Sequence, residues 1–375
     1  MTRPIYVTIH REALRNNLRV VRKAAGERAV WAVAKANAYG HGLKNAVQTF
    51  TEADGLALLE VSEAVRARDY GWQKRILLLE GFFDEQELAV IEQNHVETIV
   101  HSDWMIDMLR KHAPFKDLRC HVKINSGMNR LGFRPEQYRS VVEKLSSIAG
   151  VTVCGAVTHF ANAELSYDKG GPATFDKQLG RMKSIGAFRG EECFANSAAT
   201  LFHPEAGGDA VRAGVILYGV SPDSSVSERD LHVRPAMTFS ARIIAIQNIE
   251  AGQAVGYGSR WTAARPSRIA VVACGYADGY PRSLSNKGEV IVHGKRARIV
   301  GRICMDQFMI DVTHIPEVRS HDTVTLIGAD GGERITADDV AGWAGTIGYE
   351  ITCGISSRVP RVVYRGGEQI GVYRI

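Results

Sequence analysis

The chain has 375 residues, of which 45% are hydrophobic and 23% charged; these values are ordinary for soluble globular proteins and exclude a mostly disordered chain. Lysine and arginine number 46 and aspartate and glutamate 41, and the surplus of +5 is spread along the sequence. A nucleic-acid-binding protein would gather that charge in a stripe or tail. The length predicts more than one domain and fewer than three.

The six cysteines form no C-x-x-C pair, which argues against a zinc ribbon or a thioredoxin-like motif. Several stand inside apolar runs such as VVACGYADG, where a reduced thiol behaves as a small hydrophobe. The first residues, MTRPIYVTIHREALRNNL, lack the apolar core of a secretory signal, and no apolar run approaches the ~18 residues of a membrane span. We therefore expect a soluble, cytoplasmic protein with reduced cysteines and with neither nucleic acid nor membrane as a partner.

Residues 1–232 alternate between amphipathic segments and short apolar runs. In the first amphipathic segment, Leu14, Leu18, Val21 and Ala25 recur at helical spacing. The apolar runs that follow are RAVWAVA, DGLALL, RILLLEG, VETIVH, RCHVKI, VTVCGAVTH, EECFANS and DAVRAG. About eight strands that alternate with helices predict a (β/α)8 TIM-type barrel. A doubly wound open sheet is the alternative, but the strand count and the length favour closure.

The pattern changes after about Val233. The strand-like segments are now MTFSARIIAIQNI, RIAVVACGY, EVIVHG, RARIVGRICMDQFMIDV and DTVTLIG, separated by turn clusters such as EAGQ, NKGE and GADGG. One helical stretch, TADDVAGWAGTIG, interrupts them. Residues 233–375 are therefore predicted to form a second, mostly β domain of ordinary size.

Lys35 follows the apolar run RAVWAVA directly, within the segment AVAKANAYGHG. A lysine at a strand end often has no function beyond extending its charged group into solvent. In a barrel, however, the carboxyl ends of the strands surround the active site. A confined lysine loses proton affinity through desolvation and can then form a Schiff base with an aldehyde. Lys35 is therefore a candidate nucleophile, and Tyr39 and His41 with two glycines form a polar loop beside it.

Polar groups also follow the last four predicted barrel strands. They are Lys123 and Arg130 after RCHVKI, His159 in THFANAE, Asn196 and Ser197 in ANSAAT, and Arg212 and Gly214 in VRAGVILYG. Singly, each has a structural alternative as a solvated cation or a core histidine. The loops after strands seven and eight are the usual phosphate site of such barrels, and Ser197 and the amides of Gly214 and Val215 stand there. An imine-forming lysine beside a phosphate site suggests pyridoxal 5'-phosphate.

At this point the sequence resembles the alanine racemases, over essentially its whole length. The motifs that carry the resemblance are AVAKANAYGHG, HVKINSGMNRLGF, THFANAE, ANSAAT, VRAGVILYG, VGYGSRW, CGYADGYPR, VGRICMDQ and TIGYEITCGISSRVPR, in this order. The resemblance implies a pyridoxal-phosphate-dependent isomerase that interconverts L-alanine and D-alanine. It also implies a homodimer with shared active sites, and a role in supplying D-alanine for peptidoglycan or in alanine catabolism.

The resemblance implies a set of site residues. Those around the cofactor are Lys35, which forms the internal aldimine, Tyr39, Asn196, Ser197, Gly214, Val215 and Tyr349 near the phosphate, and Arg212 with His159 at the pyridine nitrogen. Arg130 and the backbone amide of Met305 would hold the substrate carboxylate. Tyr276 and Tyr349 resemble a pair that narrows the entrance, and no metal is implied.

The resemblance further implies a two-base mechanism through an external aldimine, with Lys35 and Tyr257 on opposite faces of the substrate. The pKa of tyrosine is ordinarily about 10, so Tyr257 needs a lowered pKa or a cationic neighbour to act as a base near neutral pH. In the family Tyr257 and Met305 come from the other subunit.

Arginine is always charged and only donates hydrogen bonds, so Arg212 should keep the ring nitrogen unprotonated. An acidic residue there would instead indicate a barrel-fold decarboxylase. Lys123 and Arg130 are two cations on one motif, and something must balance them. The resemblance implies that carbamylation makes Lys123 an anion.

Two other functions remain possible from the sequence. One is a racemase of broader amino-acid specificity on the same scaffold, against which the narrow gate of Tyr276 and Tyr349 argues. The other is a pyridoxal-phosphate-binding protein without catalysis. The roughly 140 residues after Val233, with Tyr257 and the CMDQ motif, argue against the second.

Overall fold

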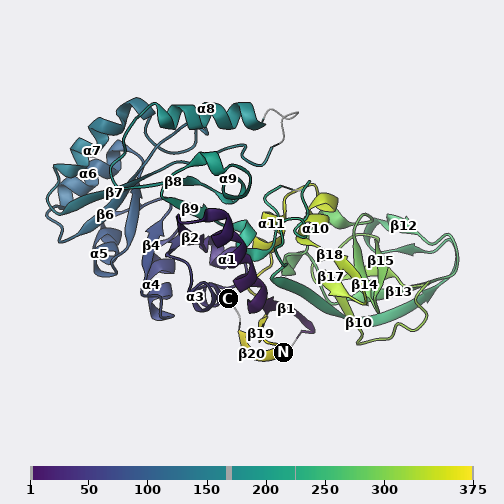
Figure 1. Cartoon of the computed structure of the whole chain (residues 1–375). Helices are drawn as coiled ribbons and strands as arrows, with labels where there is room; N and C mark the ends of the chain where they lie inside the picture. Colours follow the sequence, from purple (N-terminus) through teal and green to yellow (C-terminus); the bar gives the residue numbers. More distant parts are fainter. Residues whose placement is uncertain (1–2, 166–170, 224, 374–375) are drawn as a thin grey trace.

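The computed structural model describes residues 3–165, 171–223 and 225–373, and it has two lobes (Figure 1). One lobe is a closed barrel of parallel strands that runs in chain order from β2 to β9, and the other is built mostly of antiparallel strands. The predicted (β/α)8 barrel followed by a β domain is confirmed, and the doubly wound alternative is wrong.

The barrel lobe alternates strands and helices. The strands are β2 (Ala29–Val33), β3 (Gly55–Leu58), β4 (Arg75–Leu78), β5 (Glu97–Val100), β6 (Leu118–Lys123), β7 (Val151–Val157), β8 (Glu191–Ala195) and β9 (Ala210–Ala213). The helices are α1 (Arg11–Ala25), α2 (Lys35–Tyr39), α3 (Leu43–Thr49), α4 (Val61–Asp69), α5 (Glu85–Gln93), α6 (Asp103–His112), α7 (Tyr138–Ser146), α8 (Gly171–Lys183) and α9 (Ser197–Phe202). Every residue of β3 and β5 is buried, because helices cover the outer face of a barrel whose interior is already filled.

The apolar stripe predicted on the first helix is confirmed. Leu14, Leu18, Val21 and Ala25 are all buried on α1, while Arg22 and Lys23 stand in its last turn. A helix buries one face against the core and leaves the opposite face to polar residues, which is what this spacing predicts.

The second lobe contains a large, mostly antiparallel sheet, a separate two-stranded sheet formed by β11 and β12, and two short helices. Its strands are β1 (Ile5–His10), β10 (Met237–Ile249), β11 (Ala254–Val255), β12 (Trp261–Thr262), β13 (Ser267–Val272), β14 (Glu289–Val292), β15 (Lys295–Val300), β16 (Phe308–Asp311), β17 (Thr323–Asp330), β18 (Glu333–Ile335), β19 (Arg361–Arg365) and β20 (Glu368–Tyr373), and its helices are α10 (Ala337–Ala344) and α11 (Gly348–Cys353). The segment RARIVGRICMDQFMIDV forms β15 and β16 with a loop between them that carries CMDQ.

Strand β1 belongs to the sheet of the second lobe although it opens the chain. It pairs antiparallel with β10 and parallel with β19, so the two ends of the chain meet between the lobes (Figure 1). The domain boundary between residues 232 and 233 remains a prediction from the sequence. Strand β1 precedes this boundary in the chain but pairs with strands of the second lobe.

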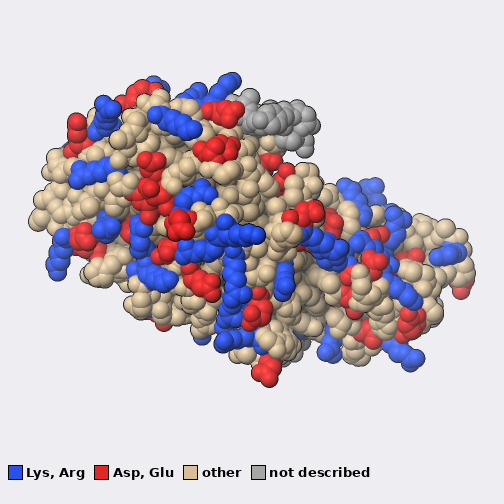
Figure 2. All heavy atoms as spheres, viewed as in Figure 1, with Lys and Arg blue, Asp and Glu red and all other residues tan. Residues whose placement is uncertain are grey.

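On the face drawn in Figure 2, basic and acidic side chains are interspersed, as their spread along the sequence indicates.

An ion-pair network closes the end of the barrel where β4, β5 and β8 begin. Arg75 contacts both carboxylate oxygens of Glu97, at 2.7 and 2.8 Å, and reaches Glu191 at 2.6 Å. His121 Nε2 lies 2.7 Å from Glu97 Oε2. Cys154 Sγ, His121 and Glu97 present potential metal ligands within 4.8 Å of one another, but the guanidinium already neutralises the carboxylate. Because this end lies opposite the active-site end of the strands, the network serves stability.

We expect Glu97→Gln to lower the free energy of unfolding by about 3 kcal/mol at pH 7. Burial alone raises the pKa of Glu97, but hydrogen bonds from Arg75 and His121 outweigh it and hold the pKa at about 2. A lowered carboxyl pKa stabilises the fold above the unfolded pKa and loses that effect as pH falls through the folded one. The difference from wild type should therefore shrink between about pH 4.5 and pH 2, as measured by denaturant unfolding.

The matched control is Glu12→Gln, because Glu12 forms an exposed pair with Arg15 on α1. Exposed pairs of this kind contribute at most about 1 kcal/mol. Equal losses in the two variants would contradict the prediction.

Candidate active site

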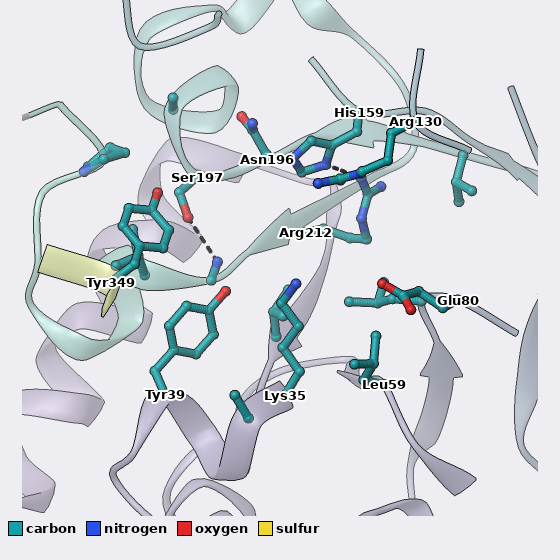
Figure 3. Close-up of a pocket in the computed structure, with 18 of the residues that line it drawn as sticks. Lys35, Tyr39, Leu59, Glu80, Arg130, His159, Asn196, Ser197, Arg212 and Tyr349 are labelled. Atoms are coloured by element: carbon teal, nitrogen blue, oxygen red, sulfur yellow. Dashed lines mark hydrogen bonds between the residues drawn. The ribbon is translucent and has the colours of Figure 1, made fainter. Parts of the chain in front are cut away.

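A cavity of about 310 Å³ opens at the carboxyl ends of the barrel strands (Figure 3). It brings together ten of the residues singled out in the sequence, from six separate stretches of the chain. They are Lys35, Tyr39, Arg130, His159, Asn196, Ser197, Arg212, Gly214, Val215 and Tyr349. Lys123 lines the same cavity. The barrel therefore gathers residues that are up to 314 positions apart into one site.

The turn that follows Lys35 has a left-handed backbone. Ala36, Asn37, Ala38 and Tyr39 have φ angles between 51° and 54°, a conformation that costs non-glycine residues roughly 1–2 kcal/mol each. Two hydrogen bonds hold this turn. The Asn37 side chain accepts from the amide of Leu43 at 2.7 Å, and the amide of Asn37 donates to the buried carboxylate of Glu63 on α4 at 3.2 Å. Strain of this kind persists where the surroundings over-determine it, as around a functional site.

Residues of the C-terminal lobe pack against the same turn. A Cβ on Gly40 would lie 2.2 Å from the carbonyl oxygen of Thr352, and φ at Gly40 is +78°, so only glycine fits there. The buried side chain of Arg361 on β19 donates to the carbonyl oxygen of Gly40 at 3.2 Å. Both lobes of one chain therefore set the position of Lys35.

The cavity concentrates positive charge. Burial lowers the pKa of Lys35, and the neighbouring charges of Arg130 and Arg212 lower it further. Burial, again with both arginines, lowers the pKa of Lys123 to about 7. The same causes hold the pKa of His159 well below its ordinary value, so this ring is neutral at pH 7. A cluster of this kind suits anionic ligands and leaves Lys35 more easily deprotonated than a free lysine.

Two acidic residues in the cavity were not singled out in the sequence. Glu80 and Glu164 both line it, and Figure 3 shows the Glu80 carboxylate on the side of the cavity opposite Tyr39. Its charge raises the pKa of Lys35 and of Lys123, against the effect of the arginines. Glu80 directly follows the strand run RILLL, so the strand-end rule that selected Lys35 would also have found it.

Arg212 is buried at the end of β9 and is held by backbone carbonyls. Its Nη1 donates to the carbonyl oxygen of Cys193 at 2.5 Å and its Nη2 to that of Thr158 at 2.6 Å. His159 Nδ1 lies 3.4 Å from the same Nη2. The guanidinium is thus fixed in the cavity wall as a permanent hydrogen-bond donor.

Hydroxyl groups gather at the other end of the cavity. Figure 3 shows the side chains of Tyr39, Ser197 and Tyr349 around one space. Ser197 Oγ accepts from the amide of Gly214 at 2.8 Å, and a Cβ on Gly214 would lie 2.5 Å from Tyr39 Oη. The missing side chain of Gly214 keeps this space open, and the hydroxyls around it suit a phosphate group.

Three residues of the predicted site lie elsewhere. Tyr257, Met305 and Tyr276 belong to the C-terminal lobe, with exposed fractions of 72%, 54% and 42%. None of the three is among the described residues that line the cavity. A single chain therefore does not bring the predicted second base to Lys35.

Both lobes of the chain match a known protein family. Residues 9–222 match the family model described as alanine racemase, N-terminal domain, and residues 236–363 match the model of the C-terminal domain. The alanine racemase of Ralstonia nicotianae is 44% identical over 98% of this chain and 97% of its own length. The solved structure of biosynthetic alanine racemase from Pseudomonas aeruginosa is 36% identical and superposes with a TM-score of 0.90 over 97% of this chain and all of that one. The alanine racemase of Bacillus anthracis with bound L-Ala-P is 33% identical, with a TM-score of 0.86 over 99% and 98%.

Proposed function

The chain belongs to the alanine racemase family of isomerases, and we propose that it interconverts L-alanine and D-alanine with Lys35 and Tyr257 as its two bases. The observation that carries the proposal is the cavity at the barrel rim, where a lysine with a lowered pKa, two arginines and a space surrounded by hydroxyl groups meet. The family is pyridoxal-phosphate-dependent. The function is tested by the absorbance spectrum of the purified protein, followed by an assay for D-alanine formed from L-alanine.

The residues of the cavity fit pyridoxal 5'-phosphate. Lys35 would hold it through the ε-amino group, and the hydroxyls of Tyr39, Ser197 and Tyr349 with the amides of Gly214 and Val215 would hold the phosphate. Asn196 would lie beside the phosphate, and Arg212, supported by His159, would donate to the ring nitrogen. The space that Gly214 leaves beside Tyr39 supports this fit. When bound, the cofactor supplies a conjugated ring that delocalises the charge left on the substrate α-carbon after deprotonation.

The residues of the site have separate roles in substrate binding and proton transfer. Arg130 and the amide of Met305 bind the substrate carboxylate and so orient the Cα–H bond. Lys35 takes or returns the α-proton on one face, and the lowered pKa of its amine eases the loss of the ammonium proton that this role requires. Tyr257 does the same on the other face. Racemisation follows because either base can deliver the proton.

Tyr257 must come from a second subunit. In one chain it is 72% exposed and belongs to the C-terminal lobe, whereas Lys35 lies at the barrel rim. We therefore propose a homodimer in which the partner subunit's Tyr257 and Met305 complete each site. Exposed Tyr276 would reach the partner's cavity entrance in the same way and narrow it with Tyr349.

Mixing inactive Lys35→Ala and inactive Tyr257→Phe subunits should restore activity. In a mixed dimer one site receives both altered residues and the other receives neither, so about a quarter of wild-type activity is expected from random mixing of equal amounts. Subunit exchange is checked by differently tagged chains, and activity is measured as D-alanine formed. Exchange without recovery would show that the bases do not act across subunits.

Two points of the function are open to direct measurement. An entrance narrowed by Tyr276 and Tyr349 would favour alanine over larger substrates, and a racemisation panel across amino acids distinguishes a strict alanine racemase from a broader one. The product serves either peptidoglycan synthesis or alanine breakdown, both of them cytoplasmic roles. Within the described part of the chain, helices long and apolar enough to cross a membrane are absent.

A further inference from the structure

A buried glutamine on α8 contacts two loops of the active site from outside the cavity. The side chain of Gln178 is 1% exposed. Its Nε2 donates to Ser126 Oγ at 3.0 Å and to the carbonyl oxygen of His159 at 3.1 Å. Its Oε1 accepts from the amide of Ala161 at 2.9 Å. A flipped amide would place donor against donor at Ala161, so the side chain has one orientation.

A directed chain of hydrogen bonds continues from Gln178. Ser126 Oγ lies 2.8 Å from Thr158 Oγ1, and Thr158 Oγ1 donates to the carbonyl oxygen of Ile124 at 2.8 Å. Because the hydroxyl hydrogen of Thr158 is used on Ile124, Ser126 must donate to Thr158. Ser126, Thr158 and Gln178 are each 1% exposed, so solvent does not compete for these bonds.

This series of hydrogen bonds connects the groups that hold Arg212 with the segment that carries Arg130. The carbonyl oxygen of Thr158 accepts from Arg212 Nη2 at 2.6 Å. Ser126 stands in the segment between β6 and α7 that also carries Arg130. Arg181, one turn after Gln178 on α8, donates to the carbonyl oxygen of Ser126 at 3.0 Å and anchors the same segment.

We propose that Gln178 is a positioning residue for racemisation. It joins the segment that carries Arg130 to the loop after β7 that carries Thr158 and His159, and through Thr158 it fixes the guanidinium of Arg212. The inference rests on the roles proposed above for Arg130 and Arg212. Gln178 is not among the described residues that line the cavity, so it acts only through the groups it holds.

The test replaces Gln178 in the complete holoenzyme. Gln178→Met keeps the length of the side chain and removes all three hydrogen bonds, whereas Gln178→Glu keeps an acceptor for the amide of Ala161 and loses the donors. In both variants we expect kcat to fall roughly tenfold in both directions and the KM for alanine to rise severalfold. The apo-protein should bind pyridoxal 5'-phosphate more weakly, as measured by fluorescence titration.

A further readout separates positioning from simple loss of stability. The number of transamination events per racemisation turnover counts only loaded, folded enzyme, and it should rise because Arg212 is less well fixed. The matched control is Lys177→Ala, since Lys177 is exposed on the same helix. The control should match wild type in all readouts.

Three outcomes would overturn the proposal, and only the third reflects failure of the role proposed for Arg212, on which it rests. Gln178→Met could lower the melting temperature but match Lys177→Ala in kcat, KM and the number of transamination events per racemisation turnover. If Arg212→Glu changes these three quantities in the same assays, Gln178 has only a structural role. If Gln178→Glu behaves like wild type, the donors do not matter and the directed chain has no role. If Arg212→Glu itself changes nothing, the assignment of Arg212 fails and the positioning role fails with it.

Discussion

Lys35→Ala is expected to lower kcat/KM for alanine by at least about 10⁴-fold, because in the proposed mechanism Lys35 is both a proton-transfer base and the attachment point of the cofactor. Lys35 stands in the cavity at the end of β2, and its lowered pKa makes the neutral amine that both proposed roles require easier to form than in a free lysine. The loss should appear equally in the L-to-D and D-to-L directions. Racemisation is followed by a coupled assay for each enantiomer.

Covalent attachment gives a second, independent measurement. After borohydride reduction, intact-mass analysis of the wild-type protein should show the added mass of the cofactor, and Lys35→Ala should not. Lys44→Ala is the control, because Lys44 is exposed on the neighbouring helix α3. A Lys35→Ala protein that still gains the cofactor mass on reduction would assign the attachment to another amine.

The barrel and most of the cavity follow from short-range patterns. Parallel strands buried on both faces read as apolar runs, and a polar residue directly after such a run lies at the barrel rim, as Lys35, His159 and Asn196 do. Glu80 also stands directly after an apolar run. That run is interpreted only as a strand in the sequence analysis, which leaves the polar residue that follows it unconsidered. The roles of these residues came from resemblance to a family, since position alone does not separate a base from a structural ion.

Other features depend on contacts that the sequence does not encode locally. The left-handed turn after Lys35 contains Ala36 and Ala38, which ordinarily avoid that backbone, and it is held by tertiary contacts. Strand β1 has an ordinary strand pattern that does not say which sheet it joins. A glutamine on an amphipathic helix usually faces solvent, so Gln178 gave no signal before its burial was seen.

The electronic role of Arg212 makes the second prediction with a large effect. A fixed guanidinium beside the ring nitrogen disfavours a second positive charge there, so the ring should stay unprotonated. The side chain is buried, and Thr158 and Cys193 hold both terminal nitrogens through their carbonyl oxygens, which keeps the charge in place. With the cofactor bound, an unprotonated ring would withdraw fewer electrons from the substrate α-carbon. Arg212 would therefore help to limit protonation at the wrong carbon.

Arg212→Glu should therefore lower racemisation by about 10³-fold or more, equivalent to about 4 kcal/mol of barrier, and raise the share of transamination. The carboxylate favours a protonated ring, which spreads the negative charge and allows protonation at the wrong carbon. Racemisation is measured as enantiomer exchange, and transamination as pyruvate released. Arg212→Gln is the control, because it removes the positive charge without adding a negative one and should give little transamination. Cofactor titration and a melting curve of each variant verify loading and folding. If loaded, folded Arg212→Glu racemised alanine at the wild-type rate and released no pyruvate, Arg212 would not be the partner of the ring nitrogen.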